Sequence, residues 1–279
     1  MRINGKTKII GVMGWPIEHS LSPRMHNAAF AAAGLDYVYL PLPVQPDQSA
    51  AAITGLKALG FVGANVTIPH KVAVMQYLDD IDRSAQMVGA VNTIVIQQGR
   101  AIGYNTDAAG FIRSLQNRQI TFAGGKAVIL GAGGAARALV CGLIDHAVDT
   151  VIIGARDRVK AAGLAHLFRD YCNIYAYDWQ QEAFNREMEN CDLLIHCTPL
   201  GMFPNIAAEP PVNWPHVNPS AAVCDIIYNP SRTRFLEQAA ARGHVVINGQ
   251  GMLVEQGAAA FELWTGQPAP REIMYSVFT

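Results

Sequence analysis

A glycine-rich segment between an apolar run and a helix-like stretch is the part of this sequence that most clearly predicts chemistry. Gly131, Gly133 and Ala136 are spaced Gly-x-Gly-x-x-Ala, directly after the apolar residues 126–130. The first glycine of such a segment makes a tight turn, the second lets backbone approach a pyrophosphate, and the third small residue allows close helix–strand packing. The start of the following helix also favours phosphate. We therefore predict a dinucleotide site at Gly131, Ala132, Gly133, Gly134, Ala135 and Ala136.

A charged cluster follows the next apolar run, residues 150–155, and consists of Arg156, Asp157, Arg158 and Lys160. At this point of a dinucleotide fold an acid usually accepts from the ribose 2′-hydroxyl, whereas arginine accommodates a 2′-phosphate. Three cations around one acid favour NADP, with Arg156 and Lys160 as candidate contacts. Asp157 keeps NAD open, and alternatively it is the N-cap of a helix that starts there.

Four polar clusters elsewhere in the chain each follow a strand-like run. They are HSLSP (19–23), NVTIPHK (65–71), VNT (91–93) and YNTD (104–107). In open α/β sheets ligands bind beyond the carboxyl ends of strands. Hydroxyl, amide and charged side chains there could pair the hydroxyls of a polyhydroxylated carboxylate, which must be hydrogen-bonded when buried. Taken singly, each cluster could be a turn or a cap, and Ser22 and Asp107 could both be N-caps.

The elements that position these clusters alternate along the first hundred residues. Strand-like runs cover 8–14, 37–44 and 63–68, and helical spacing covers 22–34 and 46–60. This order predicts a parallel sheet covered on both faces. The segments VNTIVI and AIGYNT around QQGR predict a hairpin appended to that sheet.

A second alternating series begins after the helix-like segment 107–118. Its predicted strands are 126–131, 150–155, 173–179, 192–198, 222–228 and 244–249, with a proline-rich loop at 203–220 and a helix at 252–266. We therefore predict an α/β protein of two domains with the functional cleft between them. A parallel-rich substrate-binding domain covers 1–106 and is completed by C-terminal helices in 250–279. A Rossmann-type, doubly wound dinucleotide-binding domain covers 107–249.

Composition excludes several other classes of protein. The chain has 279 residues, of which 51% are hydrophobic and 15% charged, which excludes global disorder. A net charge of −1 gives no reason to expect a nucleic-acid partner, and no apolar run is long enough to span a membrane. The five cysteines form no C-x-x-C pair, which favours a reducing compartment and the cytoplasm. The spacing of His19, His26 and His70 fits no usual zinc site, so no metal is predicted.

Seven segments, most of which contain the clusters described above, follow one another along the chain in a distinctive order. They are HSLSPRMHN (19–27), NVTIPHK (65–71), VGAVNT (88–93), GYNTD (103–107), GAGGAA (131–136), DIIYNP (225–230) and NGQGMLVEQ (248–256). With them the chain resembles the shikimate dehydrogenase family over essentially its whole length. The resemblance implies an oxidoreductase of aromatic amino-acid biosynthesis, which reversibly reduces 3-dehydroshikimate to shikimate with NADPH. Its expected partner is this small molecule, and we expect a monomer or a homodimer.

The resemblance also implies roles for single residues. The family's catalytic lysine and aspartate fall on Lys71 and Asp107, which also contact substrate. Hydride transfer to a ketone needs a proton donor within hydrogen-bond reach, which suits the lysine, and the aspartate would hold its ammonium in place. The other substrate-binding positions fall on Ser20, Ser22, Asn65, Thr67, Asn92, Tyr228 and Gln256. Beyond the glycine loop, Arg156 and Lys160, the candidate cofactor contacts are Thr198, Ile227 and Gly251.

One segment departs from the family's common pattern. Family members selective for NADP commonly have Asn-Arg-Thr where this chain has Ala155-Arg156-Asp157. The alternative is therefore a quinate/shikimate dehydrogenase that uses NAD or both dinucleotides. An alternative from another class is a catalytically silent dinucleotide sensor, which would lack the pair of Lys71 and Asp107.

Overall fold

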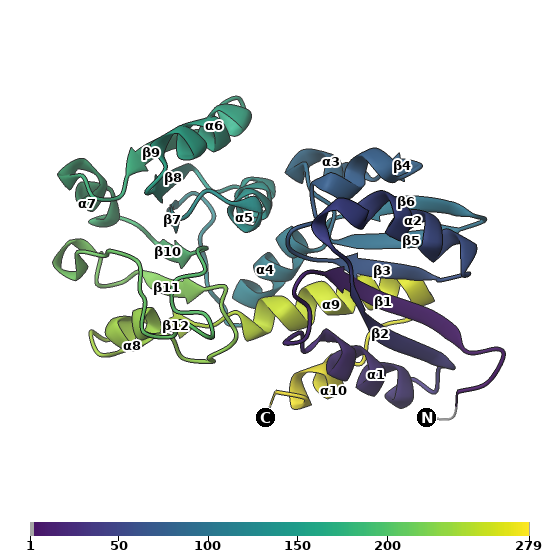
Figure 1. The fold of residues 1–279 in the computed structure, drawn as a ribbon. Coiled ribbons are helices and arrows are strands. Elements are labelled where there is room, and N and C mark those ends of the chain that lie inside the picture. Colours follow the sequence, from purple (N-terminus) through teal and green to yellow (C-terminus); the bar gives the residue numbers. More distant parts are fainter. Residues whose placement is uncertain (1–2, 279) are drawn as a thin grey trace. The chain divides into compact units, whose positions relative to one another are not determined.

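The chain is divided by its contacts into two compact units, each built around one six-stranded sheet (Figure 1). The computed structural model describes residues 3–278. The first unit extends to Gly110 and resumes at Val254, and the second extends from Phe111 to Leu253. The C-terminal segment therefore returns to the unit in which the chain begins.

The sheet of the first unit is mixed, with the strand order β2-β1-β3-β5-β6-β4. Its strands are β1 (Lys8–Gly14), β2 (Tyr37–Pro43), β3 (Gly63–Val66), β4 (Asp80–Ile81), β5 (Thr93–Gln97) and β6 (Arg100–Tyr104). Strand β1 pairs in parallel with β2 and β3, and β5 is antiparallel to both β3 and β6. The predicted parallel strands and the predicted hairpin are thus confirmed. The short β4 was not predicted.

The helices of this unit agree in part with the expectations. They are α1 (Ser22–Ala32), α2 (Ser49–Ala58), α3 (Arg83–Val88) and α10 (Arg271–Ser276); α4 (Asp107–Gln116) begins in this unit, and α9 (Gln250–Thr265) ends in it. Leu21 occupies the N-cap position of α1 and no side chain caps that helix. The interpretation of Ser22 as an N-cap is therefore wrong. Helix α3 was not predicted, and it is capped by Asp82, which accepts from the backbone N–H of Ser84.

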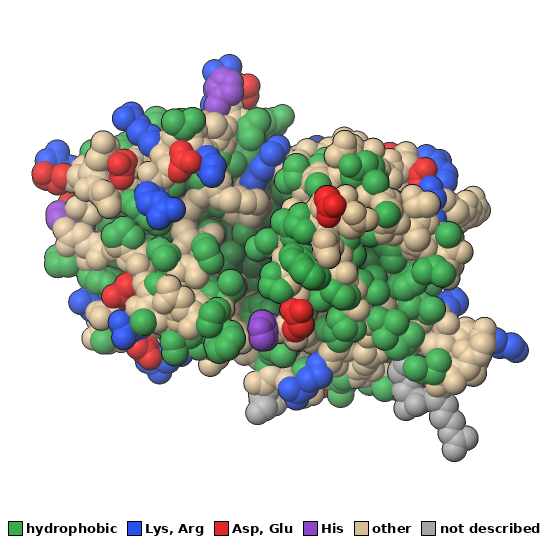
Figure 2. Space-filling model, viewed as in Figure 1, with side chains coloured by type: hydrophobic (Ala, Val, Ile, Leu, Met, Phe, Trp, Pro, Cys, Tyr) green, Lys and Arg blue, Asp and Glu red, His purple; other side chains and the backbone are tan. Residues whose placement is uncertain are grey.

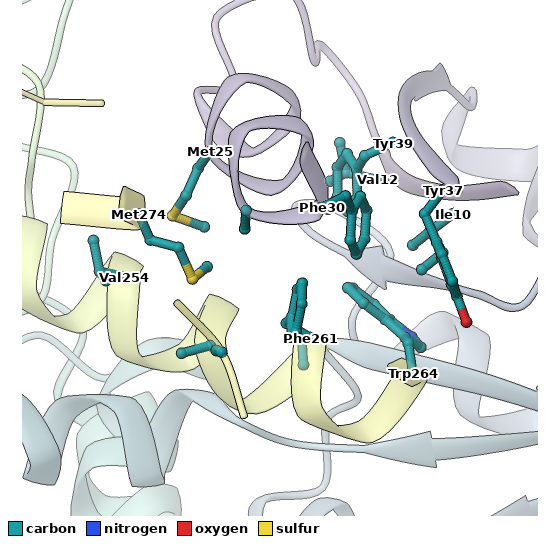
Figure 3. Packing of buried hydrophobic residues seen from close by; sticks show 14 of the residues in the cluster. Ile10, Val12, Met25, Phe30, Tyr37, Tyr39, Val254, Phe261, Trp264 and Met274 are labelled. Carbon is teal, nitrogen blue, oxygen red and sulfur yellow. The ribbon is translucent and has the colours of Figure 1, made fainter. Parts of the chain in front are cut away.

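Apolar side chains cover both faces of β1, because successive residues of a strand point to opposite faces. Ile10 and Val12 belong to a cluster with α1, α9 and α10, and Met13 belongs to a second cluster with α2. Figure 3 shows Phe30 of α1 and Phe261 of α9 pointing toward each other within the first cluster, with ring centroids 5.2 Å apart. This packing holds the first unit's C-terminal helices against its sheet.

The second unit has an all-parallel sheet with the strand order β12-β11-β10-β7-β8-β9, which is the predicted doubly wound arrangement. Its strands are β7 (Lys126–Leu130), β8 (Thr150–Ala155), β9 (Asn173–Asp178), β10 (Leu193–His196), β11 (Ala222–Asp225) and β12 (Val246–Ile247). Its helices are α5 (Gly134–Asp145), α6 (Arg158–Phe168), α7 (Glu182–Met188) and α8 (Arg234–Ala240).

Three strands of the second unit, β10, β11 and β12, are at least three residues shorter than predicted. Strand β10 ends at His196 and β11 at Asp225, so Thr198 and Tyr228 lie in loops beyond the sheet. Pro199 and Pro230 follow these loops, and proline offers no N–H to a ladder. The early strand ends place both loops at the carboxyl edge, where ligands bind in such sheets.

The surface carries charges of both signs. The face drawn in Figure 2 shows Lys and Arg as well as Asp and Glu side chains, scattered among hydrophobic and other side chains, in keeping with the net charge of −1. Within residues 3–278, no helix is both long and apolar enough to cross a bilayer.

Candidate active site

The polar clusters of the first unit meet at one edge of its sheet. Asn65 lies near the end of β3 and is paired with Thr93 at the start of β5. Thr93 is in turn paired with Tyr104 at the end of β6. Asn92 was expected beyond the carboxyl end of a strand, and this is wrong, since it precedes β5. It nevertheless reaches the same edge, because β5 runs antiparallel to both neighbours.

Lys71 and Asp107 form an ion pair at this edge. Lys71 Nζ donates to Asp107 Oδ2 at 2.6 Å, with the two side chains 25% and 10% exposed. The backbone of Lys71 is tied to the same edge, since its carbonyl accepts from the N–H of Val91 at 2.8 Å. The ammonium is thus partly open to solvent, while the carboxylate that faces it is almost covered.

Asn92 holds the other side of the Asp107 carboxylate. Its Nδ2 donates to Asp107 Oδ1 at 2.8 Å and to Thr106 Oγ1 at 3.0 Å. Its Oδ1 accepts from the backbone N–H of Thr106 at 2.8 Å. The side chain is only 2% exposed, and Gln256 Oε1 of α9 lies 3.4 Å from its Nδ2. The amide of Asn92 is therefore used to orient Asp107.

Asn65 is held in a similar way. Its Oδ1 accepts from the hydroxyl of Tyr39 at 2.6 Å, and its Nδ2 donates to the carbonyl of Asn92 and to Thr93 Oγ1, each at 3.1 Å. Because both N–H groups are used, the free hydrogen-bonding capacity of this amide is a lone pair on Oδ1.

Tyr39 is a residue that sequence reasoning missed. Burial raises the pKa of its phenol well above the ordinary value, and a hydrogen bond with the Ser22 side chain partly opposes this. Tyr39 thus links Ser22 to Asn65. Its signal in the sequence was a tyrosine at an inward position of an apolar strand, where a buried hydroxyl needs a partner.

The remaining predicted substrate positions of the first unit are Ser20, Ser22, Thr67 and Gln256. The N–H of Ser22 donates to Ser20 Oγ at 3.3 Å, so the two serines form one turn before α1. Thr67 follows β3, and its N–H donates to the carbonyl of Met13. Gln256 lies on α9, where Gly110 of α4 lacks room for a side chain, since a Cβ there would lie 2.6 Å from the Gln256 nitrogen.

Two histidines of these motifs, His70 and His26, are buried and contact other protein side chains. His70 is fully buried, with its ring nitrogens 2.9 Å from Ser49 Oγ and 2.8 Å from the carbonyl oxygen of Val44. His26 is stacked on Tyr39 with ring centroids 4.4 Å apart, and burial lowers its pKa to about 3. Across the described part of the chain, no group of three His, Cys, Asp or Glu side chains is arranged to hold a metal.

In the second unit, the glycine-rich segment forms an open backbone loop between β7 and α5. Gly131 has φ +119°, a conformation that favours glycine. No atom of the described residues lies within 4 Å of a Cβ built on Gly133 or Gly134. Helix α5 has no side-chain cap, so its first N–H groups are available for a ligand. These features fit the pyrophosphate of a dinucleotide.

Asp157 is the N-cap of α6, as the second interpretation predicted. Its Oδ1 accepts from the backbone N–H of Lys160 at 3.1 Å, and this hydrogen bond is the main cause that lowers the pKa of the carboxyl. Lys160 Nζ lies 3.6 Å from Asp157 Oδ2, and Arg156 is exposed beside them. The Asp157 carboxylate is therefore engaged in a hydrogen bond with the backbone of α6.

The other candidate cofactor residues and Tyr228 also belong to the second unit. Thr198 follows β10 and lies against the loop, because a Cβ on Gly131 would lie 2.9 Å from Thr198 Cγ2. Ile227 is 4% exposed, its N–H donates to Asp225 Oδ1 and its carbonyl accepts from the N–H of Gly249. Burial raises the pKa of Tyr228, and Gly251 lies in the first turn of α9.

Proteins of known activity that are similar to this chain include shikimate dehydrogenases. Residues 12–94 match the family described as shikimate dehydrogenase substrate binding domain, and residues 249–277 match the shikimate 5′-dehydrogenase C-terminal domain. The NADP(+) shikimate dehydrogenase of Methanopyrus kandleri is 45% identical over 277 residues, which cover 98% of this chain and 95% of that protein.

Solved structures agree in fold. A shikimate dehydrogenase crystallised with NADP+ has a TM-score of 0.92 at 43% identity, covering 99% of this chain and 96% of that one. The shikimate 5-dehydrogenase of Listeria monocytogenes, in complex with shikimate and NAD, has a TM-score of 0.94 at 34% identity, covering 100% and 99%. This chain therefore belongs to the shikimate dehydrogenase family.

Proposed function

We propose that this chain is an NADP-dependent shikimate dehydrogenase, which reversibly reduces 3-dehydroshikimate to shikimate in aromatic amino-acid biosynthesis. The observation that carries the proposal is the Lys71–Asp107 ion pair, held by Asn92 at the polar edge of the first sheet. It is supported by an NADP(+) shikimate dehydrogenase that is 45% identical to this chain over 98% of the chain's length. A silent dinucleotide sensor has no need of such a pair.

In this proposal Lys71 handles the proton. A reduced nicotinamide dinucleotide, when bound, supplies hydride to the ketone carbon. The ketone oxygen becomes a hydroxyl by taking a proton from Lys71 Nζ, and in the oxidation direction Nζ takes that proton back. Asp107 keeps the ammonium at one position through their 2.6 Å contact. The proton donor is thereby oriented before substrate arrives.

The rest of the polar edge suits a hydroxylated ring acid. Ser20 and Ser22 lie in one turn, and we assign both to the substrate carboxylate, to which the Ser20 hydroxyl can donate. Asn65 has a lone pair left on Oδ1, so it can accept from a ring hydroxyl. We assign Thr67 and Gln256 to the other ring hydroxyls, and Tyr228 as a further substrate contact.

NADP is favoured by the state of the charged cluster after β8. Asp157 is engaged as a helix cap, which leaves exposed Arg156 and Lys160 to bind the 2′-phosphate. The NADP+ complex of a 43% identical dehydrogenase agrees with this preference. Use of NAD is the second candidate, since the Listeria protein was crystallised with shikimate and NAD.

The test is an assay of shikimate and quinate, each with NADP and with NAD. We expect kcat/KM to be highest for shikimate with NADP, by at least about tenfold over either quinate or NAD, as one charge-assisted contact can provide. Comparable turnover of quinate would instead identify a quinate/shikimate dehydrogenase. Binding of dinucleotide without turnover of either acid would support the sensor.

Two further expectations remain proposals. A cytoplasmic location is supported by the five cysteines, none of which forms a disulfide. The oligomeric state, monomer or homodimer, can be measured by light scattering over a range of protein concentrations.

A further inference from the structure

A buried histidine and aspartate lie beneath the glycine-rich loop and have no part in the chemistry proposed above. His196 is the last residue of β10 and Asp225 the last residue of β11, and the two are paired across the parallel ladder. His196 is completely buried, and Asp225 is 2% exposed. A buried polar pair of this kind needs partners, because an unpaired polar group is costly away from water.

The histidine connects the aspartate to a hydroxyl at the loop. His196 Nε2 lies 2.5 Å from Thr198 Oγ1, and His196 Nδ1 lies 3.2 Å from Asp225 Oδ1. The contact of Nδ1 with Asp225 does not have the geometry of a hydrogen bond, and Nδ1 forms no hydrogen bond with any described residue. Residues 196 and 198 can both face this way because alternate residues of an extended chain point to the same side.

Asp225 decides which ring nitrogen carries the hydrogen. The carboxylate favours a hydrogen on Nδ1, because its negative charge, with Oδ1 3.2 Å away, attracts an N–H group and repels the lone pair of a bare nitrogen. Asp225 is itself fixed, since it accepts from Thr233 Oγ1 at 2.6 Å and from the Ile227 N–H at 3.0 Å. Nε2 is therefore the bare nitrogen and accepts from the Thr198 hydroxyl.

The hydroxyl of Thr198 is left as an acceptor. Its hydrogen is directed to His196, and one lone pair of Oγ1 accepts from the Leu200 N–H at 3.3 Å. The other lone pair is free for a donor on a ligand. A phosphate, which only accepts, is poorly matched to this oxygen, whereas a ribose hydroxyl or a carboxamide NH₂ is well matched.

The position of Thr198 in the sheet selects one half of the dinucleotide. In the order β10-β7-β8, the glycine loop follows β7 and Arg156 follows β8. A dinucleotide with its 2′-phosphate at Arg156 and its pyrophosphate at the loop extends its nicotinamide half over β10. That half carries the ribose hydroxyls and the carboxamide.

We propose that His196 and Asp225 are positioning residues that set Thr198 Oγ1 as the acceptor for the nicotinamide ribose or carboxamide. This inference rests on the proposed binding of NADP. His196 and Asp225 act only through Thr198 and do not touch the ligand.

The test compares NADP with 2′,5′-ADP, which lacks the nicotinamide half, by calorimetric binding to the full chain. Thr198→Val and His196→Leu should each weaken NADP binding about 3- to 10-fold, as expected for one lost hydrogen bond. Neither should change the Kd of 2′,5′-ADP by more than about twofold. His196→Gln, which retains one donor and one acceptor, should restore at least half of the lost affinity.

The double variant His196→Leu with Thr198→Val separates positioning from general support of the fold. If His196 acts through Thr198, the double variant binds NADP as weakly as Thr198→Val alone. His244→Leu is the matched control, because His244 is a second buried histidine of this unit, with Nδ1 3.1 Å from the Ala221 carbonyl oxygen. It should leave both Kd values unchanged.

Three outcomes would overturn the inference: multiplied effects in the double variant, equal losses for 2′,5′-ADP, or unchanged NADP binding in Thr198→Val. Failure of the proposed function is distinguishable from these. In that case the unmodified chain itself binds neither NADP nor 2′,5′-ADP.

Discussion

In the first unit the polar groups around Asp107 are held by other side chains, whereas in the second unit the glycine loop offers bare backbone. The amides of Asn65 and Asn92 are both used in hydrogen bonds that join β3, β5, β6 and α4. Gly133 and Gly134, by contrast, have no neighbour within 4 Å of a built Cβ in the described chain. One site is a network of side chains, and the other is the start of a helix.

This difference has a consequence for how each site responds to substitution. Removing a member of a buried network leaves its partners unpaired, so losses are large and affect the orientation of several groups. Adding an atom to an open backbone loop leaves the fold intact and obstructs only the ligand. The following predictions test this contrast, from the largest expected effect to the smallest.

Lys71→Ala should produce the largest loss. Without the proton donor, kcat for shikimate oxidation should fall about 10³-fold, within the range typical of positioned acids and bases. The Kd of NADP should change by less than about twofold, since Lys71 is absent from the glycine loop. Stopped-flow turnover and dinucleotide titration measure the two quantities.

The matched control is Lys57→Ala, which breaks a second lysine–aspartate pair of the same unit, Lys57 with Asp79 at 2.7 Å. This pair lies at the surface, so its loss should leave kcat unaltered. If Lys71→Ala retained turnover within a few-fold, Lys71 would not be the proton donor.

Gly133→Ala should weaken NADP binding about 10²-fold, because a methyl group would separate the backbone from the pyrophosphate and cost about two charged hydrogen bonds. The thermal midpoint should barely move, since Gly133 has φ −90° and open space for a Cβ. Calorimetric titration and thermal unfolding check both parts.

Gly163→Ala provides the control for adding a methyl group in this unit. Gly163 is exposed within α6 and also has space for a Cβ, and alanine should stabilise that helix slightly without affecting NADP. Unfolding of Gly133→Ala at a much lower temperature would contradict the view of an open loop.

His26 should make the first unit sensitive to acid. Its pKa is lowered by burial to about 3 from 6.5, so below pH 6.5 the unfolded chain binds a proton that the folded chain excludes. The free energy of unfolding should therefore fall by about 2 kcal/mol, an equilibrium factor of about 30, between pH 7 and pH 5. Urea unfolding monitored by circular dichroism at a series of pH values measures this slope.

His26→Leu should remove that part of the acid dependence. Phe30→Leu is a suitable control, because Phe30 belongs to the same helix and cluster but does not titrate, so it should lower stability and keep the slope. An unchanged slope in His26→Leu would show that another group binds the proton.

Arg156→Ala should have the smallest effect. Loss of one exposed charge-assisted contact should lower kcat/KM for NADP about tenfold and leave NAD unchanged. Arg169→Ala, at the other end of α6, changes the net charge equally and should not alter the NADP/NAD ratio. Equal losses for both dinucleotides would argue against a contact with the 2′-phosphate.

Much of the fold could be predicted because it depends on local patterns. The glycine spacing predicted the β7–loop–α5 unit, and the alternation of strand and helix predicted the doubly wound sheet. Asp157 was also recognised as a possible cap, since the carboxylate and the N–H that it accepts from are three residues apart. The short β4 and the helices α3 and α8 were missed, because segments of two to seven residues carry too little periodicity.

The polar edge of the first sheet was predicted less completely. Asn92 was assigned to the end of a strand, but it precedes β5 and reaches the edge through antiparallel pairing. Tyr39 was missed because its partners, Asn65 and Ser22, are distant in sequence. Hydrogen bonds of this kind depend on strand register, which no local spacing specifies.

The residue types by themselves determined the class of fold, the glycine loop and the family, because these depend on short motifs and on their order. Only the tertiary structure decided which groups are still free to bind. It shows Asn92 engaged with Asp107, Asp157 engaged with its helix, and Thr198 bonded to a buried histidine. Each of these states depends on a neighbour that packing supplies, and packing brings together residues that the sequence keeps apart.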